Sequence, residues 1–290
     1  MSATGTIRPL TSELPVAAGR TAAPFGRLLA AELRLMLRRP RTLVALGLLA
    51  LIPVLMGVTV VLSSGGPGGD FLMAAIEGSG VLLSLMALTM SLALLLPLLI
   101  SVIAADSFAG EAAAGTLRGL LLAPVGRGRL ITVKALSVLI FSALSVAVVV
   151  VVGVVVGVAL LGGDAMITAS GATIGLGEAL LRILLLAGWA TVQVFAVGAV
   201  ALALSSATER PIVVTASVMG GFIGFQLVTG FPSLDWLHPA VLTHRWMPAQ
   251  LEILNDPMNV TDLTTSFLRA CFYILIGLSL TVWRMNSKDY

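Results

Sequence analysis

The chain has 290 residues, of which 58% are hydrophobic and only 11% are charged. This composition is far too apolar for an ordinary soluble domain of that length, so it excludes that class. The single cysteine, Cys271, excludes a disulfide within the chain. The formal net charge is +3, but no basic patch interleaved with aromatic residues indicates nucleic acid as a partner.

Six long apolar stretches predict an all-α, polytopic membrane protein. A helix needs ~20 mostly apolar residues to cross ~30 Å of hydrocarbon, and each stretch reaches or nearly reaches that length. We expect residues 1–23, which are polar and contain Pro and Gly, to form a disordered N-terminal arm rather than a signal peptide. Residues 24–290 then form a single transmembrane domain. Its predicted spans are about 42–62, 81–105, 133–161, 180–205, 211–231 and 267–283.

The positive charges are biased to one side of this layout. Of the 17 Lys and Arg residues, 14 lie in the terminal segments or in and beside the 106–132 and 206–210 connections, and the other connections are mainly acidic. Basic residues stay cytoplasmic, so both termini are predicted to be inside, in agreement with an even number of spans. The Arg-, Ala- and Gly-rich composition indicates a bacterial source. We therefore expect a multi-pass protein of the bacterial plasma membrane that contacts anionic lipid headgroups.

Residues 25–39 are predicted to form an amphipathic helix before the first span. Arg27, Arg34 and Arg38 fall on one face at ~100° per residue, which is typical of an interfacial helix. Glu32 and Arg39 fall on the otherwise apolar face and weaken this pattern. Pro40 disfavours helix at the residue before it, so we predict an elbow there rather than a straight continuation into the first span.

Several features predict how the spans pack. Pro53 and Pro97 are expected to kink the first and second spans. The Gly153–Gly157 and Gly220–Gly224 spacings predict close helix contacts, within the bundle rather than at a dimer face. Lys134 and Arg182 lie at span ends, where their side chains are expected to extend to the membrane surface.

The connection over 232–266 is too apolar for a solvated loop, because it contains Trp236, Trp246 and several leucines. Short interfacial or re-entrant helices would account for these residues. His238 and His244 are separated by six positions with an intervening proline, which is not a metal-ligand spacing, so we predict no metal site.

The connection between the second and third spans carries the most information. It runs Asp106-Ser-Phe-Ala-Gly-Glu-Ala-Ala-Ala-Gly-Thr-Leu-Arg-Gly-Leu-Leu-Leu-Ala-Pro-Val-Gly-Arg-Gly-Arg-Leu130 and is followed by Lys134. The pattern predicts a short cytosolic helix that exposes leucines, including Leu117 and Leu121, and is ended by Pro124. A solvated loop gains nothing from such leucines, so we interpret this helix as a docking surface for a partner protein.

This segment resembles the membrane subunits of ABC exporters of the ABC-2 type. In those subunits an acidic residue precedes Gly-Thr-Leu, then Pro-Val-x-Arg, then a Lys that enters the next span. The resemblance extends over nearly the whole chain, because the six spans, the N-terminal elbow and the apolar segment before the last span also fit. The matching residues here are Glu111, Gly115, Thr116, Leu117, Pro124, Val125, Arg127 and Lys134.

The resemblance implies a permease without a nucleotide-binding site, paired with a second membrane subunit (homodimer or heterodimer) and with cytosolic ATPase subunits that bind ATP and Mg²⁺. No phosphate-binding Gly-x4-Gly-Lys-Ser/Thr loop is present in the sequence. The implied function is efflux of a hydrophobic or amphipathic drug, lipid or peptide across the cell membrane, from the cytosol or inner leaflet. The implied ATPase-coupling residues are Glu111, Gly115, Thr116, Leu117, Arg118, Leu121, Pro124 and Arg127.

Alternatives stay open at this point. Glu111 is interpreted either as a coupling residue or as a carboxylate at a helix start, stabilised by the helix dipole. Arg127 fits membrane anchoring as well as a partner contact. A membrane scaffold or sensor that docks a cytosolic partner without transporting anything would use the same apolar helix. A secondary carrier would need buried ionisable groups and inverted repeats, which the sequence does not display. The sequence does not identify the cargo or the residues that bind it.

Overall fold

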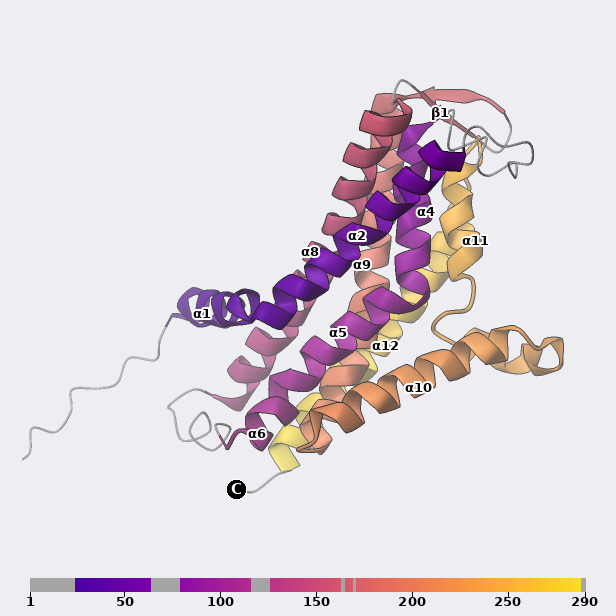
Figure 1. The fold of residues 1–290 in the computed structure, drawn as a ribbon. Coiled ribbons are helices and arrows are strands. Elements are labelled where there is room, and N and C mark those ends of the chain that lie inside the picture. The colour runs from indigo at the N-terminus through magenta and orange to yellow at the C-terminus, as the bar shows by residue number, and fades with distance from the viewer. Residues whose placement is uncertain (1–23, 64–78, 116–125, 163–164, 169–170, 288–290) are drawn as a thin grey trace, which may run out of the picture.

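The computed structural model describes residues 24–63, 79–115, 126–162, 165–168 and 171–287 (Figure 1). These residues are almost entirely helical, and six helices are long and apolar enough to cross a membrane. They confirm the six predicted spans and the all-α polytopic class. The observed helices extend beyond most of the predicted ranges: Pro40–Leu62, Gly80–Ala113, Arg127–Leu161, Leu176–Ala207, Pro211–Thr229 and Thr261–Ser287.

The first described element is α1 (Phe25–Arg38), which is separated from α2 (Pro40–Ser63) by a single extended residue. Arg39 has φ −69° and ψ 126°, the conformation favoured before a proline, so the predicted break at Pro40 is present. The three predicted elbow arginines, Arg27, Arg34 and Arg38, are exposed on α1. The placement of α1 in a membrane interface stays a prediction.

The second span is one long helix interrupted twice by π-helical turns. It comprises α4 (Gly80–Met90), the π turn η1 (Ser91–Leu95), α5 (Leu96–Ala105), the π turn η2 (Asp106–Gly110) and α6 (Glu111–Ala113). Pro97 cannot donate a hydrogen bond to the preceding turn, and η1 lies where that bond would be missing. The predicted distortion at Pro97 therefore takes the form of a π turn. Pro53 lies within α2, which is α-helical on both sides of it.

The third span, α8 (Arg127–Leu161), leads into the fourth, α9 (Leu176–Ala207), through a hairpin that the sequence did not predict. Strands β1 (Ala165–Ile167) and β2 (Thr173–Gly175) pair antiparallel, with Met166 opposite Ile174. Both of these side chains are buried against the ends of the spans. The hairpin thus closes the end of the bundle opposite α6 (Figure 1).

After α10 (Pro211–Thr229) the chain forms three short helices before the last span, α12 (Thr261–Ser287). They are η3 (Pro232–Ala240), α11 (Trp246–Leu251) and η4 (Glu252–Leu254). Short helices are therefore present where the apolar 232–266 connection predicted them. Glu252 caps α12, because its carboxylate accepts the N–H groups of Asp262 and Leu263, both at 2.9 Å. The depth of η3, α11 and η4 in a membrane, interfacial or re-entrant, stays a prediction.

Helix α9 is the centre of the bundle (Figure 1). In its most apolar 18-residue window 67% of the residues are buried, a larger share than in any other described span. It packs against α12, α8 and α5. The contact with α12 is close because Gly277 lies against the backbone of Ala199, where an added Cβ would come within 2.7 Å. The second, third, fifth and sixth spans contact this helix, whereas α2 packs against α8 and α4.

The two glycine spacings have different outcomes. Gly153 and Gly157 of α8 face α4 so closely that a Cβ on Gly157 would lie 1.9 Å from the carbonyl oxygen of Gly80. The predicted packing within the bundle is confirmed there. It is wrong for α10, since a Cβ on Gly220 or Gly224 meets nothing within 4 Å. The spacing alone did not reveal which helix has a neighbour on its glycine face.

This difference predicts opposite effects of the same substitution. Gly157→Ala forces apart two backbones in contact, so we expect a loss of about 1–3 kcal/mol in the free energy of unfolding. Gly220→Ala is the matched control and should cause no loss, because its new methyl group has open space. Thermal unfolding of the two purified variants in detergent measures the effect. Equal unfolding temperatures would contradict the α4–α8 contact.

Candidate functional site

A buried lysine joins three helices at the end of the bundle that carries α1 and α6. Lys134 is seven residues after the start of α8, and its side chain is only 1% exposed. Its Nζ donates to Glu111 at 2.6 Å and to Glu32 at 3.1 Å. Glu111 begins α6 and Glu32 belongs to α1. We call these three residues the Lys134 junction.

The geometry of the junction follows from the burial of one ammonium group. A charge removed from water needs an opposite charge and hydrogen bonds to remain ionised. Lys134 obtains both from two carboxylates, and its Nζ also lies 5.6 Å from the centroid of the Phe108 ring, within range of a cation–π interaction. Each contact comes from a different helical segment. The lysine therefore holds α1, α6 and η2 in fixed positions around the start of α8.

The π turn η2 places the acidic and aromatic side chains of this region. Buried Ser205 of α9 accepts the N–H groups of Phe108 at 3.2 Å and Ala109 at 2.9 Å, and its hydroxyl donates to the Ala105 carbonyl at 2.7 Å. These bonds satisfy backbone groups that a π turn leaves without regular α-helical partners. Ser205 therefore stabilises the widened turn from outside the helix.

A second ion pair lies beside the junction. Arg41, in the first turn of α2, pairs with Asp106 of η2 at 2.7 Å. The arginine side chain is half exposed, so the pair contributes less to stability than the buried one. It nevertheless connects the first two spans at the same end of the bundle. The Lys134 junction and this ion pair together join both α1 and α2 to the helix that precedes residues 116–125.

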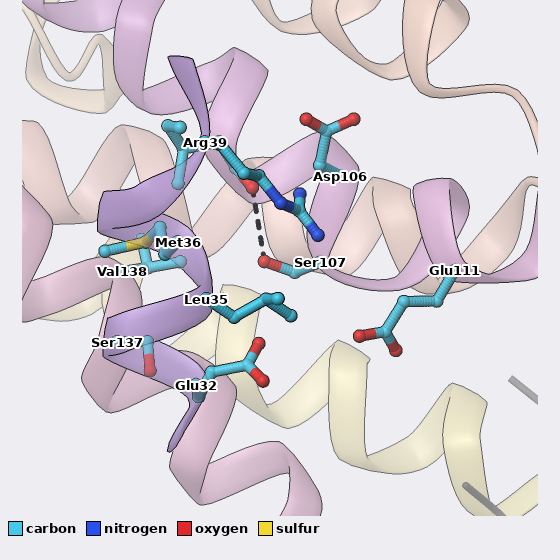
Figure 2. Close-up of a pocket in the computed structure, with 10 residues that line it drawn as sticks. Glu32, Leu35, Met36, Arg39, Asp106, Ser107, Glu111, Ser137 and Val138 are labelled. Carbon is cyan, nitrogen blue, oxygen red and sulfur yellow. Dashed lines mark hydrogen bonds between the residues drawn. The ribbon is translucent and has the colours of Figure 1, made fainter. Parts of the chain in front are cut away.

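A small pocket and a larger open cleft border the junction. Figure 2 shows the carboxylates of Glu32 and Glu111 pointing toward each other across the pocket, with Arg39 and Asp106 on the far side. The pocket volume is only about 30 Å³, about enough for one water molecule. The cleft, of about 730 Å³, lies between α1, α6 and the start of α10. Glu111 lines both spaces, so it lies between Lys134 and the cleft.

The structure describes three of the eight predicted coupling residues. Gly115 has φ +70° and ends α6, with its N–H bonded to the Ala112 carbonyl at 3.0 Å. This left-handed conformation is the usual reason for a glycine after a helix. Arg127 donates to the carbonyl of Met285 at 3.2 Å and so binds the last turn of α12. Glu111 lies in the last turn of the long helix Gly80–Ala113 and not at a helix start, so the helix-dipole interpretation is wrong; its carboxylate points to Lys134. The other five coupling residues, Thr116, Leu117, Arg118, Leu121 and Pro124, lie outside the described residues.

The expectation that Lys134 and Arg182 extend to the membrane surface is wrong. Both side chains are buried within the bundle, at 1% and 6% exposed. Arg182 pairs with Glu178 at 2.6 Å and donates to the carbonyls of Ile253 and Asn255, both at 3.0 Å. A full set of partners within the chain is more favourable for each cation than extending past other helices to reach water.

A family model described as ABC-2 family transporter protein matches residues 28–224, from α1 into α10. The chain belongs to this family. All three residues of the Lys134 junction lie within the match, whereas η3, α11 and α12 lie beyond it. No individual curated protein matches the chain at a significant level. The protein is thus an ABC-2 permease, a membrane transport component of a kind that generally works with an ATPase subunit.

Sequence reasoning missed most of the junction, although signals were present. Glu32 interrupts the apolar face of α1, and such an interruption marks a polar side chain that faces a partner inside the fold. Lys134 is the only charged residue of the predicted third span, and an isolated charge in a span requires a counter-charge. The π turn and the role of Ser205 carry no comparable signal, because they depend on how α9 packs against η2.

The junction predicts unequal effects of substitutions on stability. Lys134→Met leaves Glu32 and Glu111 without their shared cation, so we expect a loss of about 3–5 kcal/mol in the free energy of unfolding. Adding Glu32→Gln and Glu111→Gln to that variant removes the buried charges and should recover much of the loss. Arg38→Met, at an exposed position of α1, is the control. Thermal unfolding at neutral pH measures the difference. An unfolding temperature of Lys134→Met equal to that of Arg38→Met would contradict the buried ion pairs of the Lys134 junction.

Proposed function

We propose that this permease is the membrane subunit of an ATP-driven exporter that uses a separate cytosolic ATPase. The observation that carries the proposal is the position of the Lys134 junction. Glu111 and Lys134 flank residues 116–125, the segment predicted to dock on the ATPase. Their ion pair closes the base of that segment. A force on the segment therefore acts on α6, α8 and α1 as one unit.

In this mechanism ATP binding brings the two ATPase subunits together and displaces the docked segment. Because α6 continues through η2 into α5, the displacement moves the second span, and because α8 begins just beyond the segment, it moves the third span as well. The spans then exchange between inward- and outward-facing packings, a two-state change biased by nucleotide. The Lys134 junction keeps the ends of α1, α6 and α8 in fixed positions relative to one another during this change.

This geometry supports a positioning role for Glu111. Its carboxylate is directed inward at Lys134, so the surface offered to the ATPase comes from other groups. The open cleft that exposes Leu35, Ala113 and Pro211 beside the junction is suited to part of the docking surface. Arg127 holds α12 through Met285, which supports anchoring of the α8 start as its role.

Orientation and cargo follow from the charge pattern. Helix α1 and the end of α12 lie at the same end of the bundle as α6 (Figure 1). The connections and terminal segments at this end carry most of the Lys and Arg residues, so we infer that both termini are cytoplasmic. The two buried cations near the ends of the spans, Lys134 and Arg182, are both neutralised within the chain. The spans themselves are strongly apolar, which supports export of a hydrophobic or amphipathic substrate from the cytosol or inner leaflet.

The test is recovery of the tagged chain from its host in mild detergent, with co-purifying proteins identified by mass spectrometry. We expect an ATPase with a phosphate-binding Gly-x4-Gly-Lys-Ser/Thr loop, retained by the original chain and lost from the Leu121→Arg variant. Glu209→Ala, an exposed change in the next connection at the same end, is the control and should retain the ATPase. A chain recovered alone, or with a partner that has no nucleotide site, would overturn the exporter and favour a scaffold.

A second variant separates docking from coupling. Lys134→Met combined with Glu32→Gln and Glu111→Gln leaves residues 116–125 intact, so the ATPase should still co-purify. In proteoliposomes the substrate-stimulated part of ATP hydrolysis should fall by about tenfold, because the helices no longer move together. Full stimulation in this triple variant would contradict the coupling role of the junction while leaving the exporter intact.

A further inference from the structure

An apolar groove lies on the outside of the bundle, between α9, α12 and η3. Its volume is about 430 Å³. Ala203 and Leu204 of α9 line it on one side, and Ile276 and Leu280 of α12 on the other. The side chains of Leu204, Ile276 and Leu280 are 37%, 43% and 49% exposed, so the groove is open to whatever surrounds the spans. In a membrane protein these surroundings are lipid wherever no second subunit covers the spans.

The groove has one charged residue, Arg269, at one end. The lining residues of α12 extend from Arg269 to Leu280, which is ~16 Å of helix. Arg269 donates to the carbonyls of Val241 and His244, at 3.2 and 2.7 Å, and no ion pair joins it to a carboxylate among the described residues. The neighbouring Arg245, by contrast, pairs with Asp262. Arg269 is therefore a half-buried cation without a described counter-charge in a membrane-spanning helix.

The sequence of α12 predicts that Arg269 lies near the level of the lipid headgroups. It lies two residues inside the apolar part of α12, after a first turn and a half that contain Thr261, Asp262 and Thr264. A tyrosine one turn further on, Tyr273, donates its hydroxyl to the carbonyl of Ala240 at 2.6 Å and so holds η3 over the groove. A positive charge at this level, followed by an apolar channel toward the membrane centre, matches the shape of an anionic lipid.

We propose that this groove binds an anionic phospholipid of the surrounding membrane, with an acyl chain between α9 and α12 and its phosphate at Arg269. A neutral apolar ligand would leave the guanidinium without a counter-ion. A helix from a second copy of this chain would likewise have to place a carboxylate beside Arg269 to supply that counter-ion. The remaining donors of the arginine fork suit phosphate oxygens, which accept charge-assisted hydrogen bonds. This site does not depend on the direction of transport or on the ATPase.

The experiment uses the full chain, reconstituted in vesicles of equal parts phosphatidylglycerol and phosphatidylcholine and then extracted gently. Native mass spectrometry counts the lipids that stay bound. We expect the original chain to retain phosphatidylglycerol in preference to phosphatidylcholine. Arg269→Gln should reduce that preference by about tenfold, which corresponds to the loss of one charge-assisted hydrogen bond. Arg269→Lys keeps the charge and should keep most of the preference.

A second pair of variants tests the acyl-chain site without changing charge. Ala203→Phe fills the groove and should reduce retention of both lipids, whereas Leu184→Phe, at a position of α9 that is 71% exposed outside the groove, should not. Unfolding temperatures of all variants establish that the bundle is intact. Equal retention of the two lipids by the original chain, or the same preference in Arg269→Gln, would overturn the proposal. If Arg269→Lys lost as much of the preference for phosphatidylglycerol as Arg269→Gln, the role of Arg269 would be structural only and the phosphate site would be overturned.

Discussion

The burial of a single ammonium group constrains one whole end of this permease. Lys134 is almost completely shielded from solvent, so its charge is tolerated only while Glu111 and Glu32 are held within hydrogen-bond distance. This requirement fixes the positions of α1 and α6 beside the start of α8. Gly115, four residues after Glu111, then ends this helix in the left-handed conformation.

The number and order of the helices could be predicted from the sequence because hydropathy and proline positions act locally. The break at Arg39 is an example, since the ring of Pro40 alone disfavours helix there. The partners of Lys134 could not be predicted in the same way. Glu32 is 102 positions away, and its approach depends on the angle at which α1 leaves the first span. The sequence pattern showed Glu32 on the apolar face of α1, but it placed Lys134 at a membrane surface and did not pair the two.

The glycines of α8 and α10 also show that a local sequence pattern does not reveal its tertiary partner. Both spacings satisfy the requirement for close helix packing, yet only Gly153 and Gly157 have a neighbour that uses it. What decides the outcome is the route of the chain after each helix: α4 and α8 are drawn together at the hairpin end, where the N–H of Gly80 bonds to the carbonyl of Gly162 at 3.0 Å. A motif defines a surface, whereas the tertiary fold determines whether that surface is covered.

The two buried cations divide the bundle into two rigid ends and an apolar middle. Lys134 fixes α8 to α1 and α6 at one end, and Arg182 fixes the start of α9 to the carbonyls of Ile253 in η4 and of Asn255 just after it at the other. Both cations resist separation from their partners, because each would be left uncompensated in a medium of low polarity. Relative motion of the spans therefore has its lowest free-energy cost between these ends, where side chains can move past each other without breaking ion pairs. An alternating-access change in this permease should bend or rotate the middle of the spans around α9 and leave both charged ends intact.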